Sequence, residues 1–171
     1  MARVTFRLAE KLERKTRKLE RYDTMKKTLV IRAPLLSLSG YGVHCRQIFK
    51  YALHSNYFSD VRAEIVPWGQ TTWLVNPDLE DGLVGKIMER TGPIPNGQKA
   101  DVSMQVQLPN EWDANLAKFN VGVTAGVETN ICNTSWVEAC NRMDAVIFPS
   151  KHTQKTIQNS GTLNVKNYVV P

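Results

Sequence analysis

Short apolar runs alternate with helix-forming segments along residues 28–170, and this alternation limits the possible folds more than any other feature of the chain. Strands are expected to start near Thr28, Val61, Val102, Asn120, Ala145 and Asn167. Strands that are joined by helical crossovers form parallel sheets with helices packed against them. We therefore expect an α/β fold: a doubly wound, Rossmann-like, mostly parallel sheet of about six strands with helices on both faces.

Polar and glycine-rich segments follow the predicted strands. Ligands of open α/β sheets bind beyond the carboxyl ends of the strands. Residues 37–44, 108–113 and 125–130 follow the first, third and fourth strands, and they contain glycine, tryptophan and hydrogen-bonding side chains. We expect these segments to line a ligand cleft at one edge of the sheet.

The segment after the first strand contains Gly40, Tyr41 and Gly42, directly before a helix predicted from Val43. Glycine lets the backbone approach a ligand closely, and a helix N-terminus offers free N–H groups to an anion. A tight turn explains the same glycines without any ligand. A dinucleotide-binding fingerprint requires a further glycine where this chain has Cys45, which disfavours a nicotinamide enzyme.

Trp112, Glu128 and Thr129 are candidate ligand-facing residues after the third and fourth strands. The face of Trp112 is suited to stack on the C–H surface of a sugar, and covering the core of its own loop is the equal alternative. Glu128 is the candidate catalytic carboxylate, either as a base or as a group that binds a hydroxyl. Its alternative role is a structural cap. Thr129 would face the acceptor beside it.

His44 and Lys151 are candidate phosphate contacts, since each lies close to the predicted start of a helix. Ordinary surface or capping roles are the alternative for both. The sequence has no D-x-D motif, so we expect neither a metal nor another cofactor. Asn76 and Ser135 are the residues predicted to cap two further helices.

The net charge of +6 is concentrated at the N-terminus. Residues 1–27 hold ten Lys/Arg and four Asp/Glu, whereas residues 28–171 hold twelve of each. The body lacks the basic bias of nucleic-acid-binding domains, so no nucleic-acid partner is expected. Residues 1–26 are interpreted as a basic N-terminal arm, helix or tail, that packs little on the body. Weak peripheral contact with an anionic membrane and a natural start at Met25 are further hypotheses.

Cys45, Cys132 and Cys140 form no CxxC pair, which predicts free thiols in a reducing cytoplasm. No apolar stretch approaches the roughly 20 residues that span a bilayer. We therefore expect a cytoplasmic protein, which would lie at the inner face of a membrane if the arm binds lipid.

Three segments resemble the N-terminal domain of the GT-B glycosyltransferases, particularly the retaining glycosyltransferase family four. They are the strand–loop–helix 29–49, the run 122–129, and the run 136–150. The last run reads as a helix, a strand of the pattern D-x-V-h-x-P-S with h apolar, and a new helix. The resemblance covers about residues 27–171 and depends on the order and spacing of the three segments.

The resemblance implies the acceptor-binding half of a nucleotide-sugar-dependent, hexosyltransferase-like enzyme that acts on a glycan or other hydroxyl acceptor. In this family the glycine turn faces the donor's phosphates, and a C-terminal domain binds the nucleotide-sugar and supplies an E-x₇-E pair. Nothing in residues 27–171 corresponds to that domain, so this chain alone is expected to be inactive. The histidine that some members carry after the fourth strand is replaced here by Glu128-Thr129.

A non-catalytic α/β binding or scaffold module is the alternative, because the same fold serves both purposes. A nucleotide-dependent epimerase or dehydrogenase is a weaker alternative, since the incomplete glycine pattern opposes it.

Overall fold

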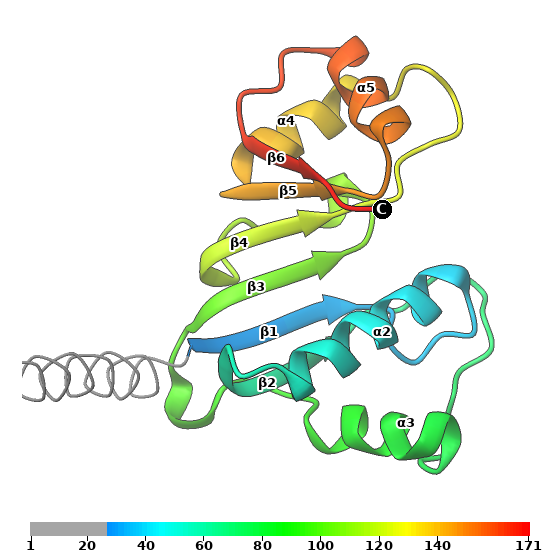
Figure 1. Ribbon diagram of the computed structural model, residues 1–171, viewed down its shortest axis with the longest axis vertical. Helices are drawn as coiled ribbons and strands as arrows, with labels where there is room; N and C mark the ends of the chain where they lie inside the picture. Colours follow the sequence, from blue (N-terminus) through cyan, green and yellow to red (C-terminus); the bar gives the residue numbers. More distant parts are fainter. Residues whose placement is uncertain (1–26) are drawn as a thin grey trace, which may run out of the picture.

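The computed structural model describes residues 27–171, which form a six-stranded sheet whose neighbouring strands are all parallel (Figure 1). The strands are β1 (Lys27–Ala33), β2 (Phe58–Ile65), β3 (Ala100–Val106), β4 (Ala117–Val123), β5 (Ala145–Phe148) and β6 (Lys166–Val169). Their order across the sheet is β2-β1-β3-β4-β5-β6, which confirms the doubly wound, Rossmann-like fold predicted from the sequence. The predictions for residues 1–26 lie outside the described residues.

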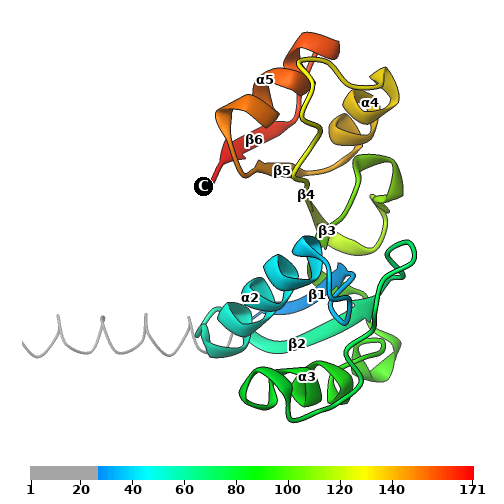
Figure 2. The same ribbon diagram turned by 90° about the vertical axis from the view of Figure 1, so that its right-hand side faces the viewer.

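Helices pack on both faces of this sheet (Figure 2). They are α2 (Gly40–His54), α3 (Leu79–Glu89), α4 (Thr134–Arg142) and α5 (Lys151–Ser160), with short 3-10 turns η1 (Pro95–Gly97) and η2 (Pro109–Glu111). The first two helices share a core with Leu29 and Ile31 of β1. The other two pack on the opposite face, over Val146 and Phe148 of β5. Because β5 is covered on both faces, its four residues are all apolar.

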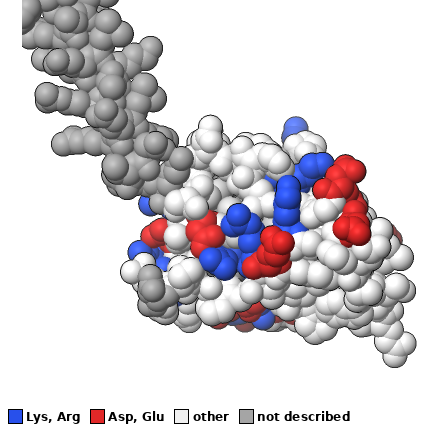
Figure 3. All heavy atoms as spheres, turned by 90° about the horizontal axis from the view of Figure 1, so that it is seen from below, with Lys and Arg blue, Asp and Glu red and all other residues white. Residues whose placement is uncertain are grey.

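The chain from α3 to β3 crosses the second face of the sheet without a helix longer than η1. A cavity of about 470 Å³ lies between residues 91–99 and the strand residues Val30 and Ala100. The neighbouring surface carries both signs of charge, as Figure 3 shows from below. Asp60 pairs there with Arg62 at 2.8 Å and with Arg90 at 3.4 Å. Acidic and basic side chains lie side by side on the face that Figure 3 draws, so no strongly basic patch is seen there among the described residues.

The caps predicted at Asn76 and Ser135 are both wrong. The Asn76 side chain accepts a hydrogen bond from the backbone N–H of Asp78 at 3.0 Å, in a turn that precedes α3. The helix α4 begins one residue before Ser135, because Asn133 accepts the Ser135 N–H at 3.0 Å. Asparagine readily bonds the backbone two residues ahead, and this local bond decides where each helix starts.

At the amino edge of the sheet, the carboxylate of Asp101 on β3 links the two neighbouring strands, β1 and β4. Asp101 accepts hydrogen bonds from the Lys118 ammonium at 2.8 Å and from the Thr28 backbone N–H at 2.9 Å. These bonds to Lys118 and Thr28 lower the pKa of Asp101 to about 2. The Asp101 carboxylate is thus used for structure, and the candidate site lies at the other edge.

Candidate functional site

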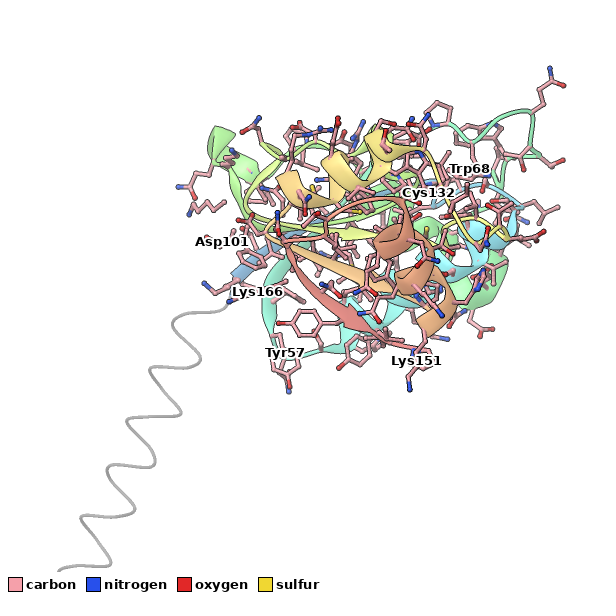
Figure 4. All side chains as sticks on the ribbon, turned by 90° about the horizontal axis from the view of Figure 1, so that it is seen from above. Tyr57, Trp68, Asp101, Cys132, Lys151 and Lys166 are labelled. Carbon is pink, nitrogen blue, oxygen red and sulfur yellow. The ribbon has the colours of Figure 1, made fainter. Side chains whose placement is uncertain are left out.

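The candidate site lies where the strand order reverses. The chain runs from β1 outward to β2 and then returns past β1 to β3, which places a switch point between β1 and β3. A hollow of about 130 Å³ lies near it, lined by Gly40, Tyr41, His44, Val106, Val123, Thr124, Ala125 and Pro149. Figure 4 shows Trp68 and Lys151 at this carboxyl edge, and Asp101 and Lys166 at the opposite edge. The start of α2 thus meets the ends of β3, β4 and β5.

Tyr41 joins the two principal loops of the site. Its hydroxyl accepts a hydrogen bond from the Ala125 backbone N–H at 3.0 Å and lies 3.5 Å from the Thr124 hydroxyl. Its ring packs against Trp68, with centroids 4.5 Å apart and planes tilted by 32°. The fold thus brings the loop after β2 against the start of α2.

The role predicted for Gly42 needs correction. The glycine turn is not a loop before the helix, because α2 begins at Gly40 and the Ser39 hydroxyl caps the Gly42 N–H at 3.1 Å. Gly42 is buried, and a side chain there would overlap the carbonyl oxygen of Ser37. This glycine therefore lets the helix pack on its own preceding loop. Gly40, by contrast, has open space where a Cβ would lie and lines the hollow.

Trp112 is a core residue, so its predicted role as a sugar-stacking residue is corrected. Its side chain is only 7% exposed and packs with Val137 and Cys140 of α4. It also fills the space left by Gly122, where an added Cβ would lie 2.7 Å from the indole ring. The alternative interpretation, in which Trp112 covers the core of its loop, is the one that the structure supports.

The loop after β4, residues 125–132, is bound along α5. The hydroxyls of Thr153 and Thr156 donate to the carbonyls of Ala125 and Thr129, each at 2.9 Å. The Ser160 hydroxyl accepts the backbone N–H of Cys132 at 2.7 Å. These bonds hold the loop at several points along its length. The Thr129 hydroxyl is used inside the loop, because it donates to the Ile131 carbonyl at 2.6 Å.

Glu128 lies between two of these attachment points. Its side chain is exposed, and it forms no hydrogen bond or ion pair with any residue in the range 27–171. The alternative role of Glu128 as a structural cap thus finds no partner in this structure. The carboxylate is free for a ligand, while its backbone is held in place by the bonds to α5.

His44 and Lys151 are both exposed, and both lie in the first turns of helices that start at the carboxyl edge. His44 lines the hollow together with Tyr41, whereas Lys151 lies outside that lining. Neither side chain bonds to another residue in the described part of the chain. The structure thus brings His44 to the hollow and leaves Lys151 at its periphery.

Arg46 holds the loop before α2 from inside the protein, and it was missed in the sequence interpretation. Its side chain is 1% exposed. The guanidinium donates to the carbonyls of Leu35 at 3.0 Å and Ser37 at 2.8 Å, and it pairs with Glu80 at 2.6 Å. It thus holds the loop that leads into Gly40. The only signal in the sequence was its position on the inward face of α2, one turn before Phe49.

Thiol and metal chemistry find no support at this edge. Burial raises the pKa of both Cys45 and Cys140 to about 12, so these thiols stay protonated and unreactive. Among residues 27–171, no group of three or more His, Cys, Asp or Glu side chains is arranged to hold a metal ion. None of the described helices is long and apolar enough to cross a membrane.

Comparison of the chain with models of protein families gave no match, and comparisons with curated proteins and with solved structures gave no match either. Function must therefore be inferred from the residues at the carboxyl edge.

Proposed function

We propose that residues 27–171 form the acceptor-binding half of a nucleotide-sugar-dependent glycosyltransferase, which transfers a sugar to a hydroxyl of a glycan or another acceptor. The hollow at the switch point carries this proposal, because Tyr41, His44 and Thr124 meet there. The exposed, unpartnered carboxylate of Glu128 lies three residues further along the chain from Ala125. A second domain that faces the same edge would hold the donor.

Glu128 is proposed to act on the acceptor hydroxyl. In the transfer, the hydroxyl oxygen bonds to the anomeric carbon of the donor sugar and loses its proton, while the bond to the nucleoside diphosphate breaks. A positioned carboxylate is suited to accept that proton. The bonds from Thr153 and Thr156 to the loop restrict the movement of Glu128. Such restriction favours a productive alignment of base and hydroxyl.

The start of α2 is proposed to face the departing diphosphate. The N-terminus of a helix presents backbone N–H groups and a partial positive charge, and both favour anions. Gly40 and Tyr41 supply such N–H groups, and the His44 side chain follows within the first turns. Lys151 at the start of α5 adds a positive charge at the same edge.

The substitution Glu128→Gln in the complete enzyme tests the proposed base. The change removes the charge and keeps the shape, so we expect kcat to fall by roughly 10²–10⁴-fold with an unchanged melting midpoint. Glu138→Gln is the matched control, because Glu138 is an exposed glutamate on α4. Full activity of Glu128→Gln would show that another group takes the proton.

Donor binding tests the division of labour between the two domains. We expect the 171-residue chain alone to bind uridine- and guanosine-diphosphate sugars with a Kd weaker than about 1 mM, measured by calorimetry. A micromolar Kd would contradict the half-enzyme proposal. If the complete protein binds a glycan but transfers nothing to it, the non-catalytic binding module becomes the better account.

A further inference from the structure

The aromatic pair of Tyr41 and Trp68 extends the wall of the candidate site. Tyr41 lines the hollow, and Trp68 is half-buried against it with ring centroids 4.5 Å apart. The two residues come from different connections, one after β1 and the other after β2. Tyr41 also packs against the core that α2 shares with β1, whereas Trp68 packs with none of the described core clusters.

Both rings are held in position. The Tyr41 hydroxyl is fixed by the Ala125 N–H at 3.0 Å. The loop that carries Trp68 is bound to the loop after β1, because the Leu38 N–H donates to the Thr72 carbonyl at 2.9 Å and the Leu74 N–H donates to the Leu36 carbonyl at 2.8 Å. A rigid aromatic surface binds a ligand at low cost in conformational entropy.

The polar groups around this pair are few and directional. The Thr124 hydroxyl and the His44 ring lie at the hollow, and the Glu128 carboxylate lies further along the same loop as Thr124. No described Arg or Lys side chain lines the hollow, so an anionic acceptor would find no side-chain cation in its lining. A half-buried aromatic pair beside hydroxyl-binding groups matches a molecule whose faces are apolar C–H and whose rim carries hydroxyls.

We propose that Tyr41 and Trp68 form a stacking platform for a saccharide ring, so that the acceptor is a glycan rather than an open-chain or aliphatic alcohol. The inference that the bound saccharide ring is the acceptor rests on the proposed function. Trp68 then takes the role that the sequence interpretation gave to Trp112. It is a specificity-determining residue, since it selects the ring and takes no part in proton transfer.

The experiment uses the 171-residue chain with methyl gluco-, galacto- and mannopyranosides, their disaccharides, and sorbitol as an open-chain control. Binding is followed by tryptophan fluorescence and saturation-transfer NMR. We expect at least one pyranoside to bind saturably and sorbitol not to bind. Trp68→Leu should weaken the binding by about tenfold or more, which is the loss typical of a stacking aromatic. Trp68→Phe should restore most of it.

Trp73→Leu is the matched control, because Trp73 lies on the same loop with 41% of its surface exposed and no aromatic partner among the described rings. It should bind like the unmodified chain. The absence of any pyranoside binding, equal binding of sorbitol, or unchanged affinity in a folded Trp68→Leu would overturn the inference.

Transfer by the complete enzyme separates this inference from the proposed function. If transfer occurs and Trp68→Leu leaves the KM for the acceptor unchanged, the stacking platform is wrong and the glycosyltransferase proposal stands. If pyranosides bind through Trp68 and no transfer occurs with any donor, the platform stands and the glycosyltransferase proposal is wrong.

Discussion

The two loops that meet at the hollow are held in place by different kinds of interaction. The loop after β1 is fixed from inside the protein, by the buried guanidinium of Arg46 and by the contact of Gly42 with Ser37. The loop after β4 is fixed by neutral hydroxyls on α5, those of Thr153 and Thr156, which are themselves buried. The first wall of the site, the loop after β1, is therefore part of the core. The second wall, residues 125–132 after β4, is bound along α5 and is called the strip below.

This difference fits the chemistry proposed for each wall. A buried charge with three oxygen partners is costly to disturb, so the start of α2 is a fixed surface on which an anion or a ring binds. A strip of neutral hydrogen bonds, each worth about 1 kcal/mol, opens locally at a lower free energy than the core. Glu128 lies on the strip, whose bonds to α5 limit the movement of its backbone while its side chain stays exposed.

The substitution Gly42→Val is expected to have the largest effect. The added side chain would overlap the Ser37 carbonyl, and backbone cannot give way cheaply, so the free energy of unfolding should fall by at least about 3 kcal/mol. Urea denaturation measures it. Gly40→Ala is the control, since open space surrounds Gly40, and we expect no loss of stability. A Gly42→Val protein of normal stability would show that this wall is not built into the core.

Removal of the buried guanidinium by Arg46→Met should rank next. It leaves the carbonyls of Leu35 and Ser37 without a donor and Glu80 without its cation, with an expected loss of about 2–4 kcal/mol. Lys50→Met on the exposed side of α2 should change the free energy of unfolding by less than about 0.5 kcal/mol. If both substitutions lowered the free energy of unfolding equally, the buried guanidinium would not be what fixes the loop after β1.

Thr156→Val should loosen the other wall by only about 1 kcal/mol, because one neutral hydrogen bond to Thr129 is lost. The local effect is measured by alkylation of Cys132, which is half-buried at the end of the loop. We expect faster alkylation of Cys132 and none of Cys45, whose thiol is buried and has a pKa raised to about 12. Accelerated modification of Cys45 would mean that the two walls open together.

Glu128→Gln should have the smallest effect on stability. The carboxylate has no partner among residues 27–171, so the free energy of unfolding is expected to change by no more than about 0.5 kcal/mol. Thermal unfolding of the isolated chain measures it. A loss of 1 kcal/mol or more would indicate that Glu128 caps the loop and belongs to the strip's own structure.

The sheet could be predicted from the sequence because its signals are local. Runs such as Ala145–Phe148 are apolar on both faces, and a serine, Ser150, caps the helix that follows. Helix starts were predicted less accurately, because Asn76 bonds the Asp78 N–H in a turn before α3 and Asn133, not Ser135, caps α4. The sequence also predicted which loops would share an edge, since that follows from parallel strands alone.

Exposure of single side chains was decided only by the tertiary structure. Trp68 and Trp112 both follow strands and both precede polar residues, yet Trp112 is buried beneath α4 and Trp68 stacks on Tyr41 at the cleft. The same holds for Arg46, a charged residue whose burial depends on carbonyls from the loop before α2 and on Glu80 in α3, which is 34 residues away along the chain. The sequence determines strands, their direction and the edge they share, because these arise from periodicity along the chain. The partners of a side chain arise largely from residues distant in sequence, so folding alone decides which aromatic packs inside and which stays partly exposed.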